Sequence, residues 1–457
     1  MNKLLQKYFG FDPATTTIRT EIIAGVSTFL TMAYILAVNP AILGITGMDK
    51  GALFATTAIT SGIATLIMAL YAKMPFGLAP GMGINAFFAY TVCLSMGHTW
   101  QFALTAVLLE GLIFILLTVT NVREKIVYSL PPSIQKAIGV GIGLFIAFIG
   151  LQNAKLVIGN KSTLVSITNF TKDFHTAGIC SLLAVVGLLI TVILYIKKVP
   201  GSILIGILAT WVIGMLCQVT GIYVPDFKTG YYSLFPTFAM TDFSKLGETF
   251  GKCFQYDLGK VGIFNFIAVV LSFLFVDLFD TLGTLVGVST KAGMLDEEGK
   301  LPGIKSALMA DAVATTAGAI LGTSTVTTFV ESSSGVAAGG RTGLTAVVSG
   351  FLFLISTLFA PLFTAIPSFA TAPALIMVGF LMFGAISDIK FTDDNMTEAV
   401  PAYLCIIAMP LFYSISEGIS IGIISYVILN VVCGKAKKIT PLMYVLAVLF
   451  ILKYAVL

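Results

Sequence analysis

The feature that most constrains this chain is a succession of apolar runs, each about as long as a helix that crosses a membrane. A spanning helix needs about 20 mostly apolar residues. Only 11% of the residues are charged, whereas soluble domains carry about 25%. The chain therefore has too few polar side chains to cover a surface in water, and the sequence predicts an all-α polytopic protein of the cell membrane.

The apolar runs number fourteen when each is taken as one span. They are Glu21–Leu43, Gly51–Tyr71, Phe76–Met96, Trp100–Thr120, Ser133–Leu151, Gly178–Ile196, Gly201–Val219, Val261–Val288, Ile304–Leu321, Thr325–Ala338, Thr342–Phe363, Ala370–Ile386, Val400–Val432 and Pro441–Val456. The run 400–432 is interrupted at Ser414–Gly418 and is open to being two shorter pieces, so the expected count is about 14.

The composition excludes several classes of protein. The net charge is a modest +4 without a basic run, so the electrostatic footprint of a nucleic-acid-binding protein is missing. The six cysteines are scattered, and the two histidines, His98 and His175, fall in predicted connections. We therefore expect no disulfide framework, no metal site and no cofactor. The first residues, Met1–Thr20, are polar and amphipathic and do not have the layout of a signal peptide.

Lysine and arginine in the short connections indicate orientation, because such residues gather on the cytoplasmic side. Ten of them share one side of a fourteen-span arrangement, which places the N-terminus in the cytoplasm: Lys3, Lys7, Arg19, Lys73, Arg123, Lys125, Lys197, Lys198, Lys291 and Lys305. Lys435, Lys437 and Lys438 fall on the opposite side, so the last third of the chain conflicts with this arrangement.

The number of spans and a weak self-similarity suggest an internal repeat. Residues 54–66 read FATTAITSGIATL and residues 309–321 read MADAVATTAGAIL, and each segment precedes a broken span. Two copies with an odd number of spans must lie in opposite orientations, which is a recurrent arrangement in secondary transporters. We therefore expect a 7+7 inverted repeat.

Two spans are broken, the third and the tenth, and the residues of the tenth predict a short strand inside the membrane. In the tenth, Thr325–Val330 reads TVTTFV, which favours an extended strand, and serines 332–334 are candidates for the start of a half-helix. In the third, FGLAPGMGINAFFAY (76–90), Pro80 and three glycines prevent a continuous helix, and Asn85 opens an apolar helical stretch. Such backbone is tolerated where it is buried in protein or lines a cavity, so we expect the half-helices to face a ligand. The alternative for the third span is an ordinary kinked helix.

Acidic side chains inside the spans are candidates for a site. A carboxylate at the bilayer centre costs about 2.5–3.5 kcal/mol, so its presence needs a reason. The candidates are Glu110, Asp277, Asp280, Asp311 and Glu331. Asp277 and Asp280 are three apart and share a helix face, with no lysine or arginine in their span. We interpret Glu331 and at least one of this pair as substrate and proton ligands, although a hydrogen bond to a half-helix would also explain an aspartate. Asp311 is open between function and helix packing, and Glu110 is assigned a structural role.

The chain resembles a known family in these same segments. The opening Thr20–Leu43, then APGMGINAFFAY (79–90), FLFVDLFDTLGTLVGV (273–288), GTSTVTTFVESSSGVAAGGRTG (322–343) and TAPALIMVG (371–379) are similar to the AzgA-like adenine/guanine/hypoxanthine permeases. These permeases form a branch of the nucleobase–cation symporter-two family, also called the nucleobase–ascorbate transporter family. The likeness runs nearly end to end.

The resemblance implies a division into a core domain, from spans one to four and eight to eleven, and a gate domain from the rest. The expected boundaries are 1–122 and 261–366 for the core, and 123–260 and 367–457 for the gate. The resemblance also places the substrate between the short strands and half-helices of spans three and ten, facing span eight.

Seven residues form the predicted substrate-binding set. The resemblance places Asn85, Asp277, Asp280 and Glu331 at the purine, and the last three are also the proton-coupling candidates. Ser332 is added as a predicted helix start, and Phe87 and Phe329 because their rings flank the broken spans and can stack on a flat base.

The sequence departs from the uracil and xanthine branches of this family. Those branches carry Gln or Glu followed by Asn-x-Gly in the tenth span, where this chain has Glu331-Ser-Ser-Ser-Gly335, and a histidine in the first span, where this chain has none. We therefore expect import of hypoxanthine, guanine or adenine by proton symport with alternating access. Glu331 would hold the base, and Asp277 or Asp280 would bind it or take the proton. Sodium coupling, the preferred base and a homodimer stay open.

Two other functions are weaker. An anion carrier of the same broad fold, for sulfate or bicarbonate, should have no acidic residue at its half-helix N-termini, where this chain has Glu331. It could have a basic residue there, but Arg341 is ten residues further on and is expected near the cytoplasmic end. An intramembrane aspartyl protease would use Asp277 or Asp280 with Asp311, but its Gly-x-Gly-Asp motif is absent. We therefore expect a transporter and not an enzyme.

Overall fold

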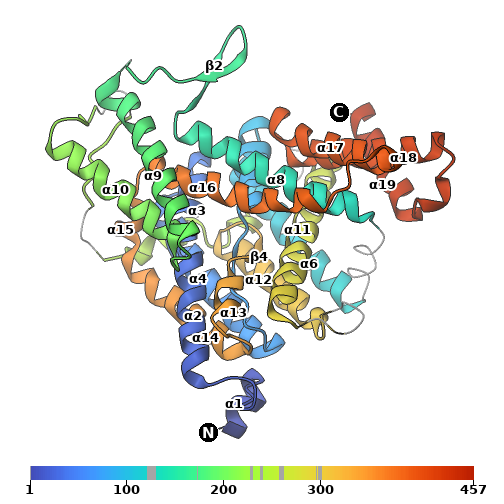
Figure 1. The fold of residues 1–457 in the computed structure, drawn as a ribbon, viewed down its shortest axis with the longest axis horizontal. Coiled ribbons are helices and arrows are strands. Elements are labelled where there is room, and N and C mark those ends of the chain that lie inside the picture. Colours follow the sequence, from blue (N-terminus) through green and yellow to red (C-terminus); the bar gives the residue numbers. More distant parts are fainter. Residues whose placement is uncertain are drawn as a thin grey trace. The chain divides into compact units, whose positions relative to one another are not determined.

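The protein, seen here in a computed structural model, is built mainly of helices (Figure 1). The structure describes residues 2–120, 130–171, 173–226, 230–236, 240–256, 262–294, 296 and 301–456. Within these residues, ten helices are long and apolar enough to cross a membrane, and three shorter helices are apolar as well. The predicted all-α polytopic membrane protein is confirmed. Arg123 and Lys125, which contributed to the predicted orientation, lie outside the described residues.

The chain divides into two compact units, each assembled from three stretches of sequence. Unit 1 comprises Met1–Ala79, Ile146–Thr249 and Glu331–Val378, and unit 2 comprises Pro80–Phe145, Phe250–Val330 and Gly379–Leu457. These units group residues by contact. The predicted core and gate domains are defined by function, and they stay a prediction.

Unit 1 contains helices from the beginning, the middle and the tenth and eleventh spans of the chain. They are α1 (Asn2–Phe9), α2 (Ile18–Met32), α3 (Ile35–Leu43), α4 (Lys50–Ile67), α9 (Ile179–Ile196), α10 (Ser202–Val219), α13 (Ser332–Ala337), α14 (Gly343–Ser356) and α15 (Ala360–Thr364). A hairpin of β2 (Val157–Asn160) and β3 (Leu164–Ile167) pairs antiparallel. Helices α8 (Pro132–Asn153) and α16 (Ser368–Phe383) run from one unit into the other.

Small residues bring the helices of unit 1 close together. A Cβ built on Gly25 of α2 would lie 2.5 Å from the carbonyl oxygen of Thr345 in α14, and one on Gly62 of α4 would lie 3.0 Å from that of Gly350. Helix pairs in membranes gain stability from such approach, because lipid and side chains are equally apolar and packing must supply the attraction. Helix α14 is therefore held against both α2 and α4.

Unit 2 contains the remaining helices: α5 (Met82–Ala86), α6 (Trp100–Val119), α11 (Ile263–Ala292), α12 (Ile304–Leu321), α17 (Met396–Leu411), α18 (Ile415–Val432) and α19 (Pro441–Val456). The main helix pair is α6 with α12. A Cβ on Gly111 of α6 would lie 2.9 Å from the backbone nitrogen of Thr316 in α12, so a larger residue would force the two helices apart. This close pairing supports the elements that carry the acidic residues of unit 2.

The long apolar run 400–432 is two helices that pack side by side (Figure 1). Helix α17 ends at Leu411, and Ser414 caps the start of α18 by accepting from the Glu417 N–H at 3.3 Å. The two-piece alternative thus describes this run. If each piece crosses the membrane, Lys435, Lys437 and Lys438 return to the side of the other connecting lysines, and the conflict in the predicted orientation disappears.

Two short strands interrupt the helices at membrane depth, as predicted. They are β1 (Leu78–Pro80) and β4 (Val326–Thr328), and all their residues are buried. Each strand leads into a short helix: β1 into α5, and β4 into α13. The two strand-and-half-helix segments are confirmed, while the 7+7 inverted repeat stays a prediction.

Candidate substrate-binding site

The third span breaks where a glycine is required. Gly81 donates its N–H to the Thr325 carbonyl at 3.0 Å and precedes the first residue of α5. A Cβ on Gly81 would lie 2.9 Å from Thr327 Oγ1, so a side chain here would push against β4. The half-helix begins at Met82, three residues earlier than the expected start at Asn85, and Gly81 is its N-cap residue in extended conformation.

Glu331 stands directly before α13, at the break that the sequence predicts. Its carbonyl accepts from the Ser334 N–H at 2.9 Å, which closes the first turn of the half-helix. One carboxylate oxygen, Oε1, accepts from the hydroxyl of Tyr34 at 2.5 Å, and the Glu331 carbonyl also lies 3.3 Å from Thr31 Oγ1. The Glu331 side chain is only partly exposed. The carboxylate is therefore anchored on one side by the first span, all within unit 1.

Ser332 has a different environment from its neighbour. Its side chain is fully buried, and its Oγ accepts from the N–H of Gly77 at 2.9 Å. Gly77 lies just before β1, so this bond connects the start of α13 to the strand of the third span. The hydroxyl thus fixes the position of the half-helix.

Two further contacts hold α13 in unit 1. The guanidinium of Arg341 donates through Nη1 to the carbonyls of Val336 and Gly340, each at 2.7 Å, and so satisfies the end of the half-helix. The buried carboxylate of Glu21, on α2, accepts from the N–H groups of Arg341 at 3.0 Å and Thr345 at 3.1 Å, at the start of α14. The Arg341 guanidinium is therefore hydrogen-bonded to backbone carbonyls and is not directed at a site for an anion.

In unit 2, Asn85 lies inside α5 and is fully buried. Its Nδ2 is 3.4 Å from the Pro80 carbonyl, and its Oδ1 accepts from the hydroxyl of Ser324, just before β4. A second buried link joins Thr325, whose hydroxyl donates to Glu110 Oε2 at 2.6 Å. Glu110 thus ties α6 to the segment before β4, which agrees with the structural role assigned to it.

Asp277 and Asp280 lie on the same helix, α11, but in different surroundings. Asp277 is fully buried, and its Oδ1 accepts from the hydroxyl of Thr281 at 2.8 Å; Asp311 Oδ2 on α12 lies 3.3 Å from the same hydroxyl. Asp280 is partly exposed, and its Oδ2 lies 3.4 Å from Thr327 Oγ1 on β4. One buried carboxylate therefore faces a second acid, and the other faces the strand of the tenth span.

The two candidate aromatic residues are buried side chains of unit 2. Phe87 is 1% exposed and packs edge-on against Phe273 of α11, with ring centroids 4.8 Å apart. Phe329 is 5% exposed and follows β4 directly. The structure thus groups Asn85, Asp280 and Phe87 with elements of spans three, eight and ten inside unit 2.

The residues that sequence reasoning missed are hydroxyl donors: Tyr34, Thr281, Ser324 and Thr327. Nothing in the local pattern distinguishes them from the many other hydroxyl residues in the spans. The one available signal was the need of each buried acid for a hydrogen-bond donor, because buried polar groups are nearly always hydrogen-bonded.

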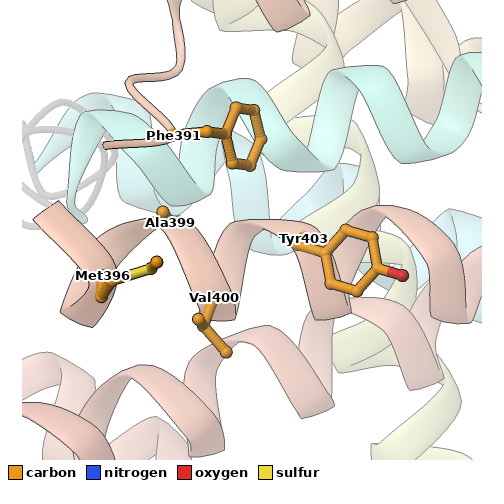
Figure 2. Close-up of a pocket in the computed structure, with 5 residues that line it drawn as sticks. All are labelled: Phe391, Met396, Ala399, Val400 and Tyr403. Atoms are coloured by element: carbon orange, nitrogen blue, oxygen red, sulfur yellow. The ribbon is translucent and has the colours of Figure 1, made fainter. Parts of the chain in front are cut away.

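A shallow pocket of about 180 Å³ lies elsewhere, along α17 in unit 2. Figure 2 shows its five lining residues, Phe391, Met396, Ala399, Val400 and Tyr403. They are apolar apart from the Tyr403 hydroxyl, and the set contains none of the predicted site residues. It lacks the convergent polar groups that recognition of a base would need.

Comparison with known proteins agrees with the resemblance read from the motifs. The model of a family described as a permease family matches residues 19–452. The chain belongs to this permease family. It is thus a multi-pass transporter of the cell membrane and not an enzyme, as predicted.

Two relatives match along almost their whole length. The guanine/hypoxanthine permease PbuG of Bacillus subtilis is 45% identical, over 98% of this chain and 99% of that protein. The adenine permease AdeP of Escherichia coli is 40% identical, over 98% of this chain and 96% of that protein. Both identities are high enough to show a common fold and family.

A solved structure has a similar fold at low sequence identity. The transmembrane domain of the cyanobacterial bicarbonate transporter BicA superposes with a TM-score of 0.62 at 15% identity, covering 89% of this chain and 97% of that one. This likeness concerns the fold alone. It shows that one architecture serves different transporters, so the choice of substrate must come from the side chains.

Proposed function

We propose that this permease imports purine nucleobases across the cell membrane by proton symport with alternating access. The observation that carries the proposal is the carboxylate of Glu331, placed at the start of an intramembrane half-helix and anchored through one oxygen by Tyr34. A carboxylate accepts two N–H bonds side by side, and a purine presents such donors along its edge. Relatives named as guanine/hypoxanthine and adenine permeases support the same substrate class.

The other candidate residues receive roles from their surroundings. Asp280, partly exposed beside β4, suits contact with the base. Asn85, Ser332, Phe87 and Phe329 are buried, and their assignment to the base rests on the sequence alone. Asp277 is buried beside a second acid, Asp311, and two acids in low dielectric do not both ionise readily. We therefore assign the proton to Asp277 ahead of Asp280. The division into core and gate domains, with an N-terminus in the cytoplasm, is part of the same proposal.

The direct experiment is uptake of radiolabelled hypoxanthine, guanine and adenine into proteoliposomes, with and without an inward proton gradient and in the presence or absence of sodium. Gradient-stimulated uptake that a subset of these bases competes would support the proposal and identify the preferred base. No uptake of any purine by folded protein would refute it. Stimulation by a sodium gradient in place of a proton gradient would refute the coupling alone.

A matched pair of variants tests the role of Glu331. Glu331→Gln keeps the size of the side chain but removes the charge and one acceptor, so it should abolish purine binding. Glu110→Gln changes a carboxylate assigned to structure and should leave the affinity of folded protein near that of the wild type. Unchanged purine affinity in Glu331→Gln would remove this residue from the site.

The anion-carrier alternative finds no support in the described residues around α13. The carboxylate of Glu331 stands at its N-terminus, and the cation nearest along the chain, Arg341, is bonded to the carbonyls of Val336 and Gly340. An anion at this place would meet a like charge. Competition of purine uptake by sulfate or bicarbonate would be the outcome that revives this alternative.

A further inference from the structure

Tyr34 occupies a special place in the first span. Helix α2 ends at Met32 and α3 begins at Ile35, so Tyr34 lies in the break between the two helices. Its side chain is fully buried, although it ends in a polar hydroxyl. That hydroxyl donates to Glu331 Oε1 at 2.5 Å, across 297 residues of sequence and within unit 1. The break therefore places a strong hydrogen-bond donor at Glu331, the carboxylate on which the proposed function rests.

The first span holds the tenth through contacts of three kinds. The Thr31 hydroxyl lies 3.3 Å from the Glu331 carbonyl, and Gly335 packs so closely on α2 that a Cβ there would lie 2.7 Å from the Ala24 carbonyl oxygen. These two contacts fix the backbone and the helix face of α13. The Tyr34 bond differs from both because it acts on the carboxylate itself.

A carboxylate held at one oxygen is restricted in rotation. The terminal torsion of glutamate is broad and roughly two-fold, so a free carboxylate exchanges its two oxygens and samples many planes. With Tyr34 bound to Oε1, the plane of the group is set, and Oε2 together with the remaining lone pair of Oε1 points in a defined direction. Fixing an acceptor before the ligand arrives lowers the entropy that binding must otherwise remove.

We propose that Tyr34 is a positioning residue for substrate recognition, which orients the Glu331 carboxylate so that it can accept N–H groups from the edge of a flat heterocyclic base. The inference rests on the proposed function, in which Glu331 binds the base. Tyr34 does not touch the substrate in this scheme. It acts through Glu331, so its removal weakens binding and leaves the later steps of transport unchanged.

The rival explanation is that the phenol only satisfies a buried polar contact needed for folding. A matched control separates the two. Tyr223, also in unit 1, is 2% exposed, and its hydroxyl donates to the Tyr232 carbonyl at 2.7 Å. Tyr34→Phe and Tyr223→Phe each remove one buried phenolic hydrogen bond, but only the first bond ends on Glu331.

The experiment compares wild type, Tyr34→Phe and Tyr223→Phe in proteoliposomes, with equilibrium binding and thermal unfolding measured on the same purified proteins. A hydrogen bond to a charged group is strong enough that its loss should raise the KM and the Kd for the transported purine about tenfold. The maximal rate should stay within about twofold, since the proposal changes binding and not the translocation step. Tyr223→Phe should leave KM and Kd unchanged.

Each other outcome overturns the inference in a recognisable way. Unchanged KM and Kd in Tyr34→Phe, with active wild type, would refute the positioning role and leave the proposed function intact. Equal increases in both variants would assign the effect to folding. A loss of maximal rate at constant Kd would place Tyr34 in the transport cycle instead. Wild-type protein that takes up no purine would refute the proposed function, and the inference would fall with it.

Discussion

Gly335 is a point of close approach of α13 to α2, and replacing it with alanine tests this packing directly. A Cβ at Gly335 would collide with Thr28 Oγ1 and would lie 2.7 Å from the Ala24 carbonyl oxygen. The threonine hydroxyl can rotate away, but the helix backbone cannot. A shift of about 0.3 Å is needed to bring the second contact to 3.0 Å, below which real Cβ atoms essentially never lie.

The cost of that shift has two parts. Overpacking of a close helix contact destabilises by about 1–3 kcal/mol. The shift also moves Glu331, the N-cap residue of the same half-helix, relative to Tyr34, and the hydrogen bond of 2.5 Å between them depends on the present spacing. We expect Gly335→Ala to lower the unfolding temperature and to raise the KM for purine at least about threefold. Displacing a binding group by a fraction of an ångström weakens its hydrogen bonds to the substrate.

The assay is purine uptake together with thermal unfolding of the purified variant, with Gly139→Ala as the matched control. Gly139 lies within α8, and a Cβ there would have nothing within 4 Å, so alanine should be neutral or stabilising by about 0.5–1 kcal/mol. Thr28→Ala removes one of the two clashes and should restore part of the loss in Gly335→Ala. If Gly335→Ala behaves like Gly139→Ala in both measurements, α13 does not pack on α2 as described.

Three further predictions concern topology and local stability. Cys433 is the exposed one among the six cysteines and follows α18. If α17 and α18 both cross the membrane, Cys433 lies on the cytoplasmic side, so a membrane-impermeant maleimide should label it in a Cys217→Ser background only after the cells are permeabilised. Labelling of intact cells would contradict this topology. Arg341→Ala removes two bonds to the end of α13 and should destabilise by about 1–3 kcal/mol in thermal unfolding, with Arg341→Lys intermediate; wild-type stability would show that the cap is dispensable. Asp49 caps α4 by accepting from the Ala52 N–H at 2.9 Å, and its other carboxylate oxygen lies 3.0 Å from Lys245 Nζ. Burial alone would raise the pKa of Asp49, but the Ala52 N–H and Lys245 together hold it below the ordinary value of 3.8. A lowered folded pKa gives stability above pH 3.8 that is lost as the pH falls. Asp49→Asn keeps the cap but loses the charge that pairs with Lys245, so it should cost at most about 1 kcal/mol at neutral pH and progressively less in acid. A pH-independent difference would contradict the assignment.

Much of the fold can be read from local sequence because its causes are local. A run of apolar residues is long enough to span a bilayer or it is not, and a proline with several glycines, or a run of β-branched residues, breaks a helix where it stands. The break of the third span, the strand β4 and the start of α13 beside Glu331 were therefore predictable from local sequence, whereas a strand at β1 followed only from the family resemblance. The cost of burying a carboxylate likewise depends on the residue itself, which is why the acidic candidates stand out in the sequence alone.

What only the tertiary structure decided is which group serves each buried charge. Tyr34 and Glu331 are separated by 297 residues, and Glu21 reaches the start of α14 across 320 or more. One hydroxyl in a span looks like any other until packing selects a single partner for the acid. The different surroundings of Asp277 and Asp280, identical in type and on one helix, come from the neighbours α12 and β4. The sequence shows that each buried acid requires a hydrogen-bond donor, and the packing of distant helices determines which residue provides it.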